Sequence, residues 1–161
     1  MIRRDFITLA GTAAGLAMMS LPLRAETILL TVSGDVEGGA YTFDDEALLA
    51  LPQIEFETET IWTEGLQRFS GPSLASVLEA AGAGAGDLTL RAINDYTVAM
   101  PRAVVEAEAP IVANRIGGMP FSRRDKGPLW IVFPYDADAR FRSESVYAYS
   151  VWQLTDISVG G

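Results

Sequence analysis

Five apolar residues in a row, Leu-Trp-Ile-Val-Phe at positions 129–133, lie between Pro128 and Pro134. A short, wholly apolar run that is rich in β-branched and aromatic residues is typical of a strand buried on both faces. Such a strand needs other parts of the chain to pack against each side of it. The sequence therefore predicts a sheet-containing domain in which this segment is a central, doubly buried strand.

The rest of the chain reads as strands interleaved with short helices. Residues 54–61 alternate, so that Ile54 and its period-two neighbours share one face while Glu55, Glu57 and Glu59 form a solvated acidic face. No repeat, low-complexity segment or linker interrupts the pattern, which predicts a single α+β domain with a mixed sheet. Strands are expected at residues 28–32, 54–61, 88–93, 96–100, 111–115, 129–133 and 151–159, and short helices at 44–51, 73–81 and 101–107.

Residues 1–25 are expected to be an export signal rather than part of the fold. Arg3 and Arg4 give it a positive start, residues 9–23 are mildly apolar, and an imperfect small-residue cleavage site ends at Ala25. Paired arginines followed by a phenylalanine resemble the twin-arginine signal, which a receptor reads and which does not anchor the protein. An ordinary secretory signal with two arginines is the alternative. Both predict the periplasm, with cleavage near Ala25.

The chain of 161 residues contains no cysteine and no histidine. This composition excludes disulfides, thiolate metal sites, cysteine nucleophiles, imidazole ligands and the commonest general base. Removal of residues 1–25 takes away three arginines and one aspartate, so the net charge of −9 becomes −11 for the domain of residues 26–161. Nucleic acid is not an expected partner, because phosphate binding requires a basic face.

Five motifs follow one another along the domain. They are Phe-Ser-Gly-Pro-Ser-Leu at 69–74 with Val-Leu-Glu-Ala-Ala-Gly at 77–82, Asn-Asp-Tyr-Thr-Val-Ala-Met-Pro at 94–101, Ile-Val-Ala-Asn-Arg at 111–115 with Gly-Gly-Met-Pro at 117–120, Arg-Asp-Lys-Gly-Pro-Leu-Trp-Ile-Val-Phe-Pro at 124–134, and Val-Trp-Gln-Leu-Thr-Asp-Ile-Ser-Val at 151–159. In this order, over about residues 54–159, they resemble the oxidoreductase molybdopterin-binding domain, the fold of sulfite oxidase and its bacterial relatives. The resemblance implies that fold, with a cleft for a pterin cofactor.

The metal site of that family is not preserved. In the family a cysteine thiolate holds molybdenum at the end of the strand before the first motif, whereas residues 60–65 here carry Trp62 and Thr63 near that place. Neither side chain can replace a soft thiolate. Family members also tend to have a lysine before the tryptophan of the last motif, but Val151 precedes Trp152 here. We therefore expect a pterin-sized cleft without metal ligands or catalytic residues.

A pterin is a flat heterocycle that needs a plane to stack on and polar groups along its edge. Trp62 is expected to form the stacking wall, with a core tryptophan as the alternative. Asn94, Asp95 and Tyr96 lie in a predicted turn that the resemblance implies is close to the cofactor. Ordinary turn chemistry explains the same residues.

Further candidates come from charge and position. Arg115 follows an apolar strand and is expected to project into the cleft, with a surface arginine as the alternative. The basic cluster Arg123, Arg124 and Lys126 suits an anionic ligand tail or a negative patch on a partner, and a solvated loop is its plainer interpretation. Tyr135 follows the apolar run, where clefts of such folds open.

Three functions stay open from the sequence. The first is a non-catalytic periplasmic protein that binds a pterin-like molecule. The resemblance implies that such stand-alone proteins act with an inner-membrane signalling partner of the cyclic-di-GMP enzyme type. The second is a molybdopterin-dependent oxidoreductase, or an accessory subunit of one, with atypical metal ligation. The third is an interaction module with a degenerate cleft. No oligomeric state is predicted.

Overall fold

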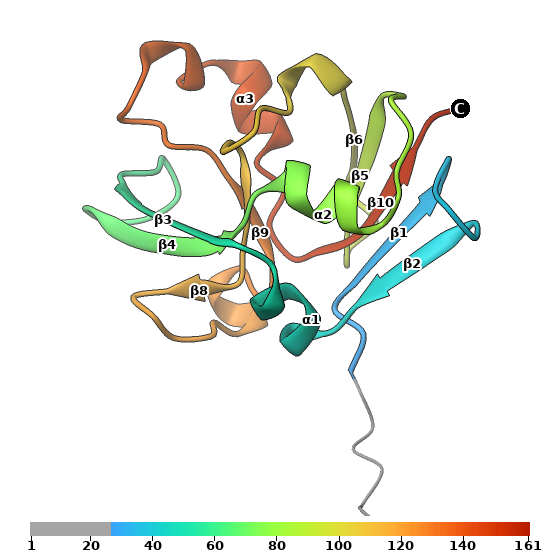
Figure 1. The fold of residues 1–161 in the computed structure, drawn as a ribbon. Helices are drawn as coiled ribbons and strands as arrows, with labels where there is room; N and C mark the ends of the chain where they lie inside the picture. Colours follow the sequence, from blue (N-terminus) through green and yellow to red (C-terminus); the bar gives the residue numbers. More distant parts are fainter. Residues whose placement is uncertain (1–26) are drawn as a thin grey trace, which may run out of the picture.

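A computed structural model of the chain describes residues 27–161 (Figure 1). The predicted export signal of residues 1–25 lies outside the described residues. The strands are β1 (Leu30–Gly34), β2 (Ala40–Phe43), β3 (Gln53–Thr58), β4 (Gln67–Pro72), β5 (Leu88–Ala92), β6 (Thr97–Met100), β7 (Ile111–Ala113), β8 (Arg115–Ile116), β9 (Trp130–Val132) and β10 (Leu154–Val159). The helices are α1 (Asp45–Ala50), α2 (Leu74–Ala80) and α3 (Glu144–Tyr149), with single 3₁₀ turns η1 (Arg102–Val104), η2 (Arg123–Asp125) and η3 (Ala139–Phe141).

The largest sheet has five strands in the order β2-β1-β10-β5-β6. Its centre is a parallel pair, in which Val32 of β1 lies opposite Ile157 of β10, while the other pairs are antiparallel. The sheet is therefore mixed, and the predicted α+β class with one mixed-sheet domain is confirmed at this level. In Figure 1 this sheet lies to the right, and α2 covers part of it from the front.

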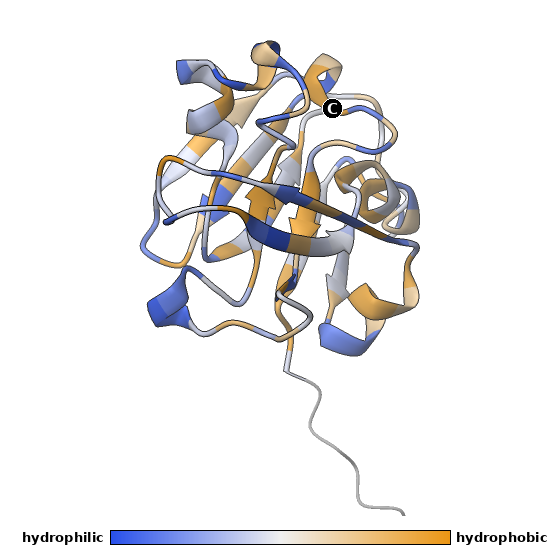
Figure 2. Ribbon diagram, turned by 90° about the vertical axis from the view of Figure 1, so that its left-hand side faces the viewer, coloured by the Kyte–Doolittle hydropathy of each residue, from blue (hydrophilic) through white to orange (hydrophobic). Residues whose placement is uncertain are grey.

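The apolar run at 129–133 contains β9 (Trp130–Val132), and all five side chains of the run are fully buried, as predicted. The strand also has a neighbour on each edge, as expected of a central strand. β9 pairs with β7 in a two-stranded sheet separate from the five-stranded one, and its other edge lies against the chain just before β10: Ile131 N–H donates to Val151 O and Leu154 N–H to Leu129 O. Figure 2 shows these apolar strands behind the polar ribbon of β3 and β4.

A third sheet has the order β3-β4-β8. The alternation predicted for residues 54–61 is observed as far as Thr58: Glu55 and Glu57 are exposed, while Phe56 is partly buried and Thr58 buried. The strand then ends, and a loop leads to β4, which returns antiparallel with Phe69 opposite Phe56. Strand β4 lies between the loop and α2, where no strand is predicted from the sequence.

Several predicted boundaries are also wrong. The strand expected at 111–115 divides at Asn114 into β7 and β8, which belong to different sheets. The helix expected at 101–107 is only the 3₁₀ turn η1. Helices α1 and α2 agree with prediction, because Asp44 and Ser73 cap them through side-chain oxygens that accept the N–H groups of residues 47 and 76. Strand β2 and helix α3 were not predicted.

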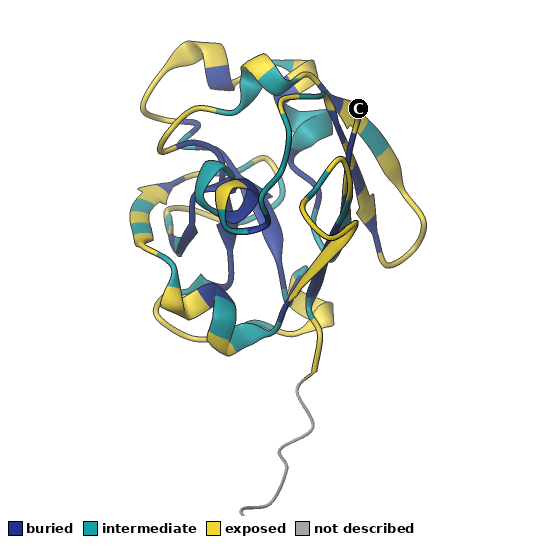
Figure 3. Cartoon of the chain, turned by 45° about the vertical axis from the view of Figure 1, so that its right-hand side comes forward, coloured by how far each residue is buried: buried dark blue, intermediate teal, exposed yellow. Residues whose placement is uncertain are grey.

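The core lies between the five-stranded sheet and the two smaller sheets, and α2 closes it with Leu74, Val77 and Leu78. Figure 3 shows the buried residues in the middle of the domain and the exposed ones around its rim. Within residues 27–161, no helix combines the length and the hydropathy that a bilayer-spanning helix needs.

Candidate functional site

A pocket of about 250 Å³ opens between α3, the turn from β5 to β6, and the loop after β3. We call it the tryptophan pocket. Four aromatic side chains dominate its wall, and small or uncharged polar residues complete it. The lining residues are Trp62, Ala92, Asn94, Tyr96, Tyr147, Ala148, Ser150, Val151 and Trp152.

Trp62 is partly buried and sits within a cluster of aromatic rings. Its ring centroid lies 5.5 Å from that of Trp152, 5.7 Å from Tyr147, 5.9 Å from Trp130 and 6.3 Å from Tyr135, all in edge-to-face geometry. Such pairs stabilise beyond the area they bury, by about 0.5–1.5 kcal/mol each. The cluster therefore fixes one wall of the pocket.

The loop that carries Trp62 is held by its own polar groups. Trp62 N–H donates to Thr60 Oγ1 at 3.1 Å, and the Thr60 and Thr63 hydroxyls are 2.7 Å apart. At the start of the loop, Glu59 N–H donates to the Asp136 carboxylate at 2.7 Å. These bonds set the direction in which the indole enters the cluster.

The opposite wall comes from the turn between β5 and β6. Tyr96 N–H donates to Asn94 Oδ1 at 3.2 Å, and the Tyr96 hydroxyl donates to the Ala148 carbonyl on α3 at 3.3 Å. Asn94 lines the pocket and is exposed, and its Nδ2 donates no hydrogen bond to any residue between 27 and 161. Asp95 adopts a left-handed backbone (φ 65°), and its carboxylate lies 3.8 Å from Arg91. Asp95 is a turn residue outside the pocket lining.

Ser150 joins the pocket to the buried residues beneath it. Its hydroxyl accepts a hydrogen bond from the Tyr135 hydroxyl at 2.6 Å and donates to the Val146 carbonyl at 2.8 Å, while its carbonyl accepts the Trp130 indole N–H. Burial raises the pKa of Tyr135 to about 12, against the opposing effect of the Ser150 hydrogen bond. Tyr135 is thus a neutral, buried support and does not line the tryptophan pocket.

None of the nine lining residues carries a charge. Sites that take drug-sized ligands have volumes of about 300–1,000 Å³, so this pocket suits a smaller molecule. An anionic group inside it would be left without a counter-charge, which is costly. The pocket therefore suits a neutral, flat ligand with a few hydrogen-bonding groups.

Arg115 does not line the tryptophan pocket. Its guanidinium makes two hydrogen bonds to Asp45, at 2.8 and 2.7 Å, and a third to the Asn114 carbonyl. The hydrogen bond from Arg115, assisted by its charge, lowers the pKa of the Asp45 carboxyl. The ion pair joins β8 to α1. Because the guanidinium points to Asp45, the predicted projection of Arg115 into the cleft is not observed.

The basic cluster lies on the far side of the aromatic wall. Lys126 Nζ sits 5.9 Å from the Trp152 ring centroid and 6.0 Å from that of Trp130. Lys126 and Arg124 line a separate hollow, whereas Arg123 lies beside Gln153, whose side-chain amide donates to the Arg123 carbonyl at 2.8 Å. The cluster therefore does not reach into the tryptophan pocket.

Of the residues singled out from the sequence, Trp62, Asn94 and Tyr96 meet in the pocket. Tyr147 and Trp152 complete its wall and were not among the candidates. The concentration of Tyr147, Tyr149 and Trp152 within six positions was the available signal, but only the packing of α3 shows which of these rings face the pocket.

The residues present do not fit the metal of the family that the sequence motifs resemble. The chain has no cysteine or histidine, and no group of three or more potential metal-ligating residues occurs in the described part of the domain. Molybdenum in that family depends on a thiolate, which tryptophan and threonine cannot replace. Comparison with protein-family models and with curated proteins found no match to this chain.

Proposed function

We propose that this protein is a non-catalytic binding protein for a neutral, pterin-like heterocycle, which it holds in the tryptophan pocket. The observation that carries the proposal is an aromatic pocket of heterocycle size whose lining has no charge. Trp62 and Trp152 offer apolar surface to a flat ring, and the free Asn94 amide offers a hydrogen bond to its edge.

The order of the sequence motifs and the mixed α+β architecture support a fold of the sulfite oxidase molybdopterin-binding type. With the twin-arginine-like signal of residues 1–25, they support a periplasmic role. In that setting the ligand-bound and ligand-free forms are read by an inner-membrane signalling protein of the cyclic-di-GMP enzyme type. The long hydrogen bond from Tyr96 to Ala148 lies at the pocket, where a ligand would alter it.

A molybdopterin-dependent oxidoreductase is less well supported. Its metal would need a soft ligand that this chain does not contain, and its phosphorylated cofactor would bring negative charge into a pocket whose lining holds no cation. The lining residues therefore do not support a redox reaction at this site.

An interaction module without a small ligand is a second candidate. The packing of Trp62 against four other rings favours it, because that packing leaves a pocket of only about 250 Å³. The two candidates differ in whether the pocket takes up a ligand at all.

Calorimetric titration of the mature domain with oxidised and reduced pterins tests the proposal. One-to-one binding is expected, weakened about 5- to 150-fold in Trp62→Ala, as the loss of roughly 1–3 kcal/mol of ring burial and stacking predicts. Tyr41→Ala, which removes an exposed ring from β2 outside the pocket, should bind like the wild type. If no pterin of either oxidation state binds saturably, the ligand-free interaction module replaces this proposal.

A further inference from the structure

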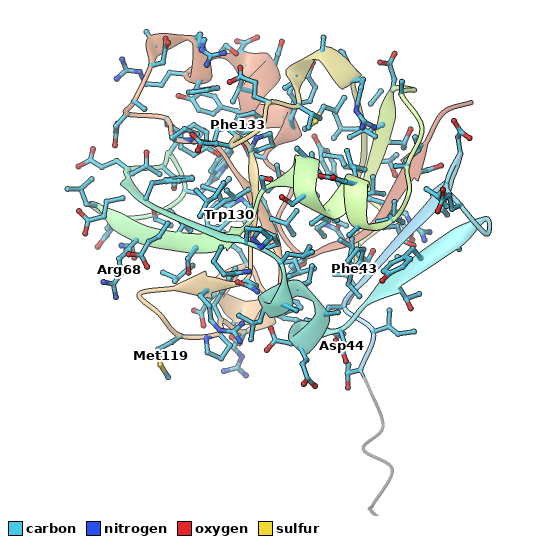
Figure 4. All side chains as sticks on the ribbon, in the orientation of Figure 1. Phe43, Asp44, Arg68, Met119, Trp130 and Phe133 are labelled. Carbon is cyan, nitrogen blue, oxygen red and sulfur yellow. The ribbon has the colours of Figure 1, made fainter. Side chains whose placement is uncertain are left out.

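The ammonium group of Lys126 lies against two neighbouring tryptophans, one of which lines the tryptophan pocket. Lys126 Nζ is 5.9 Å from the ring centroid of Trp152 and 6.0 Å from that of Trp130. Trp152 belongs to the pocket lining, whereas Trp130 is fully buried and lies near the middle of the molecule in Figure 4. A cation within about 6 Å of an indole is attracted by the negative charge of the ring face. Lys126 therefore interacts with the pocket wall although it does not line the pocket.

The charge of Lys126 is not paired with a carboxylate. Lys126 forms no ion pair within residues 27–161, although Glu64 and Asp125 line the same hollow as its side chain. The residue is half-buried, so its ammonium group loses part of its hydration. The two indole rings are the groups that compensate for this loss.

The backbone of Lys126 is joined to the chain of the same pocket wall. Lys126 ends the turn η2 in a left-handed conformation (φ 71°), which favours glycine or asparagine over lysine. Its carbonyl accepts a hydrogen bond at 3.0 Å from the N–H of Gln153, the residue directly after Trp152. One residue thus contacts the ring of Trp152 through its side chain and the adjoining backbone through its carbonyl.

We infer that Lys126 is a positioning residue for Trp152 and, through that ring, for the ligand of the tryptophan pocket. The attraction between the ammonium group and the indole makes the position of the ring depend on the positive charge at residue 126. Trp152 and Trp62 lie 5.5 Å apart with an interplanar angle of 69°, so a shift of Trp152 changes the surface that both rings offer to a ligand. The inference rests on the proposed function for its ligand. It goes beyond that function because it gives Lys126 a role that needs no anionic group on the ligand.

The variants Lys126→Met and Lys126→Arg test this role. Methionine and arginine face the same left-handed backbone as lysine, so the comparison isolates the charged end of the side chain. Arg124→Met is the matched control, because Arg124 lines the same hollow but forms no cation–π contact in the described residues. We expect Lys126→Met to weaken pterin binding about 3- to 10-fold in calorimetric titration, at low and at high salt alike. Lys126→Arg and Arg124→Met should bind the pterin like the wild type.

A second measurement needs no ligand. In the near-ultraviolet circular dichroism spectrum of the ligand-free protein, Lys126→Met should change the tryptophan bands, whereas Lys126→Arg and Arg124→Met should leave them as in the wild type. If the bands change in this way but no pterin binds the wild type, the proposed function fails and the positioning of Trp152 by Lys126 stands.

Three results would overturn the inference about Lys126. The first is a Lys126→Met variant with unchanged tryptophan bands or with the pterin affinity of the wild type. The second is an equal loss of pterin affinity in Arg124→Met, and the third is a loss in Lys126→Met that disappears at high salt. The second and third results would mean that the basic turn attracts an anionic ligand directly, because salt screens such an attraction.

Discussion

Asn114 is buried between β7 and β8, and neither its carboxamide oxygen nor its nitrogen has a hydrogen-bond partner within residues 27–161. Its backbone is engaged, since Asn114 N–H donates to the Ser70 carbonyl. A buried polar group without a partner costs about 1–3 kcal/mol. The side chain is therefore a local source of instability at the point where the chain passes from one sheet to another.

Replacing this amide by an apolar group of similar shape should stabilise the domain. We expect Asn114→Leu to raise the free energy of unfolding by about 1–2 kcal/mol, measured by urea denaturation. Asn114→Asp, which would bury a charge at the same position, should lower it. A loss of stability in Asn114→Leu would contradict this assignment and show that the amide has an ordered partner such as an internal water.

The ion pair between Arg115 and Asp45 should make stability depend on pH in the acid range. The hydrogen bond from Arg115 holds the folded-state pKa of Asp45 below its ordinary value of 3.8. The stabilisation is therefore complete above pH 3.8 and is lost as the pH falls through the lower folded-state pKa. Because the Asp45 side chain is 47% exposed, the ion pair contributes only about 0.5–1 kcal/mol to the free energy of unfolding.

Urea denaturation of the wild type and Asp45→Asn at pH 6 and pH 2 measures this effect. The wild type should have a higher free energy of unfolding than the variant at pH 6, and this difference should become smaller or vanish at pH 2. If the difference in free energy of unfolding did not depend on pH, the carboxylate would contribute through helix packing rather than through its charge.

At the scale of elements, the close approach of β4 and β7 depends on Gly71. A Cβ atom at this position would lie 2.1 Å from the Val112 carbonyl oxygen and 2.9 Å from Ala113 Cα, both of them backbone atoms. We expect Gly71→Ala to cost at least about 2 kcal/mol in thermal or urea unfolding, because the strands must separate. Gly160→Ala, whose Cβ meets only ordinary contacts, should change stability by less than about 0.5 kcal/mol. Equal effects of the two substitutions would rule out this packing account.

The elements that the sequence predicted are those with a strong local signal. Helix α2 has the Ser73 cap and the apolar spacing of Leu74, Val77 and Leu78, and β9 has an unbroken apolar run. Strands β2 and β4 were missed for a physical reason. β2 is short, and three of its four residues are exposed, while β4 includes a glycine and a proline and owes its conformation to its partners β3 and β8.

At the scale of the whole molecule, the candidate site was predictable only in part. Three of the candidate residues, Trp62, Asn94 and Tyr96, line the tryptophan pocket. The position of Arg115 was not predictable, because its partner Asp45 lies 70 residues earlier in the chain. The basic cluster reads as one unit in the sequence, but the aromatic wall of Trp130 and Trp152 separates it from the pocket. The positions of Arg115 and of the basic cluster depend on contacts between segments that are distant in the sequence.

For the molecule as a whole, the proposed function requires that the tryptophan pocket hold an uncharged heterocycle without a metal. Native mass spectrometry of the protein purified from its own cell compartment, with metal analysis of the same sample, reports both the ligand and the metal. We expect one bound molecule with the mass of an unphosphorylated pterin, no stoichiometric molybdenum, and loss of that mass in Trp62→Ala. Molybdenum bound one-to-one, or a protein with no small molecule both as purified and after incubation with pterins, would contradict the proposed function.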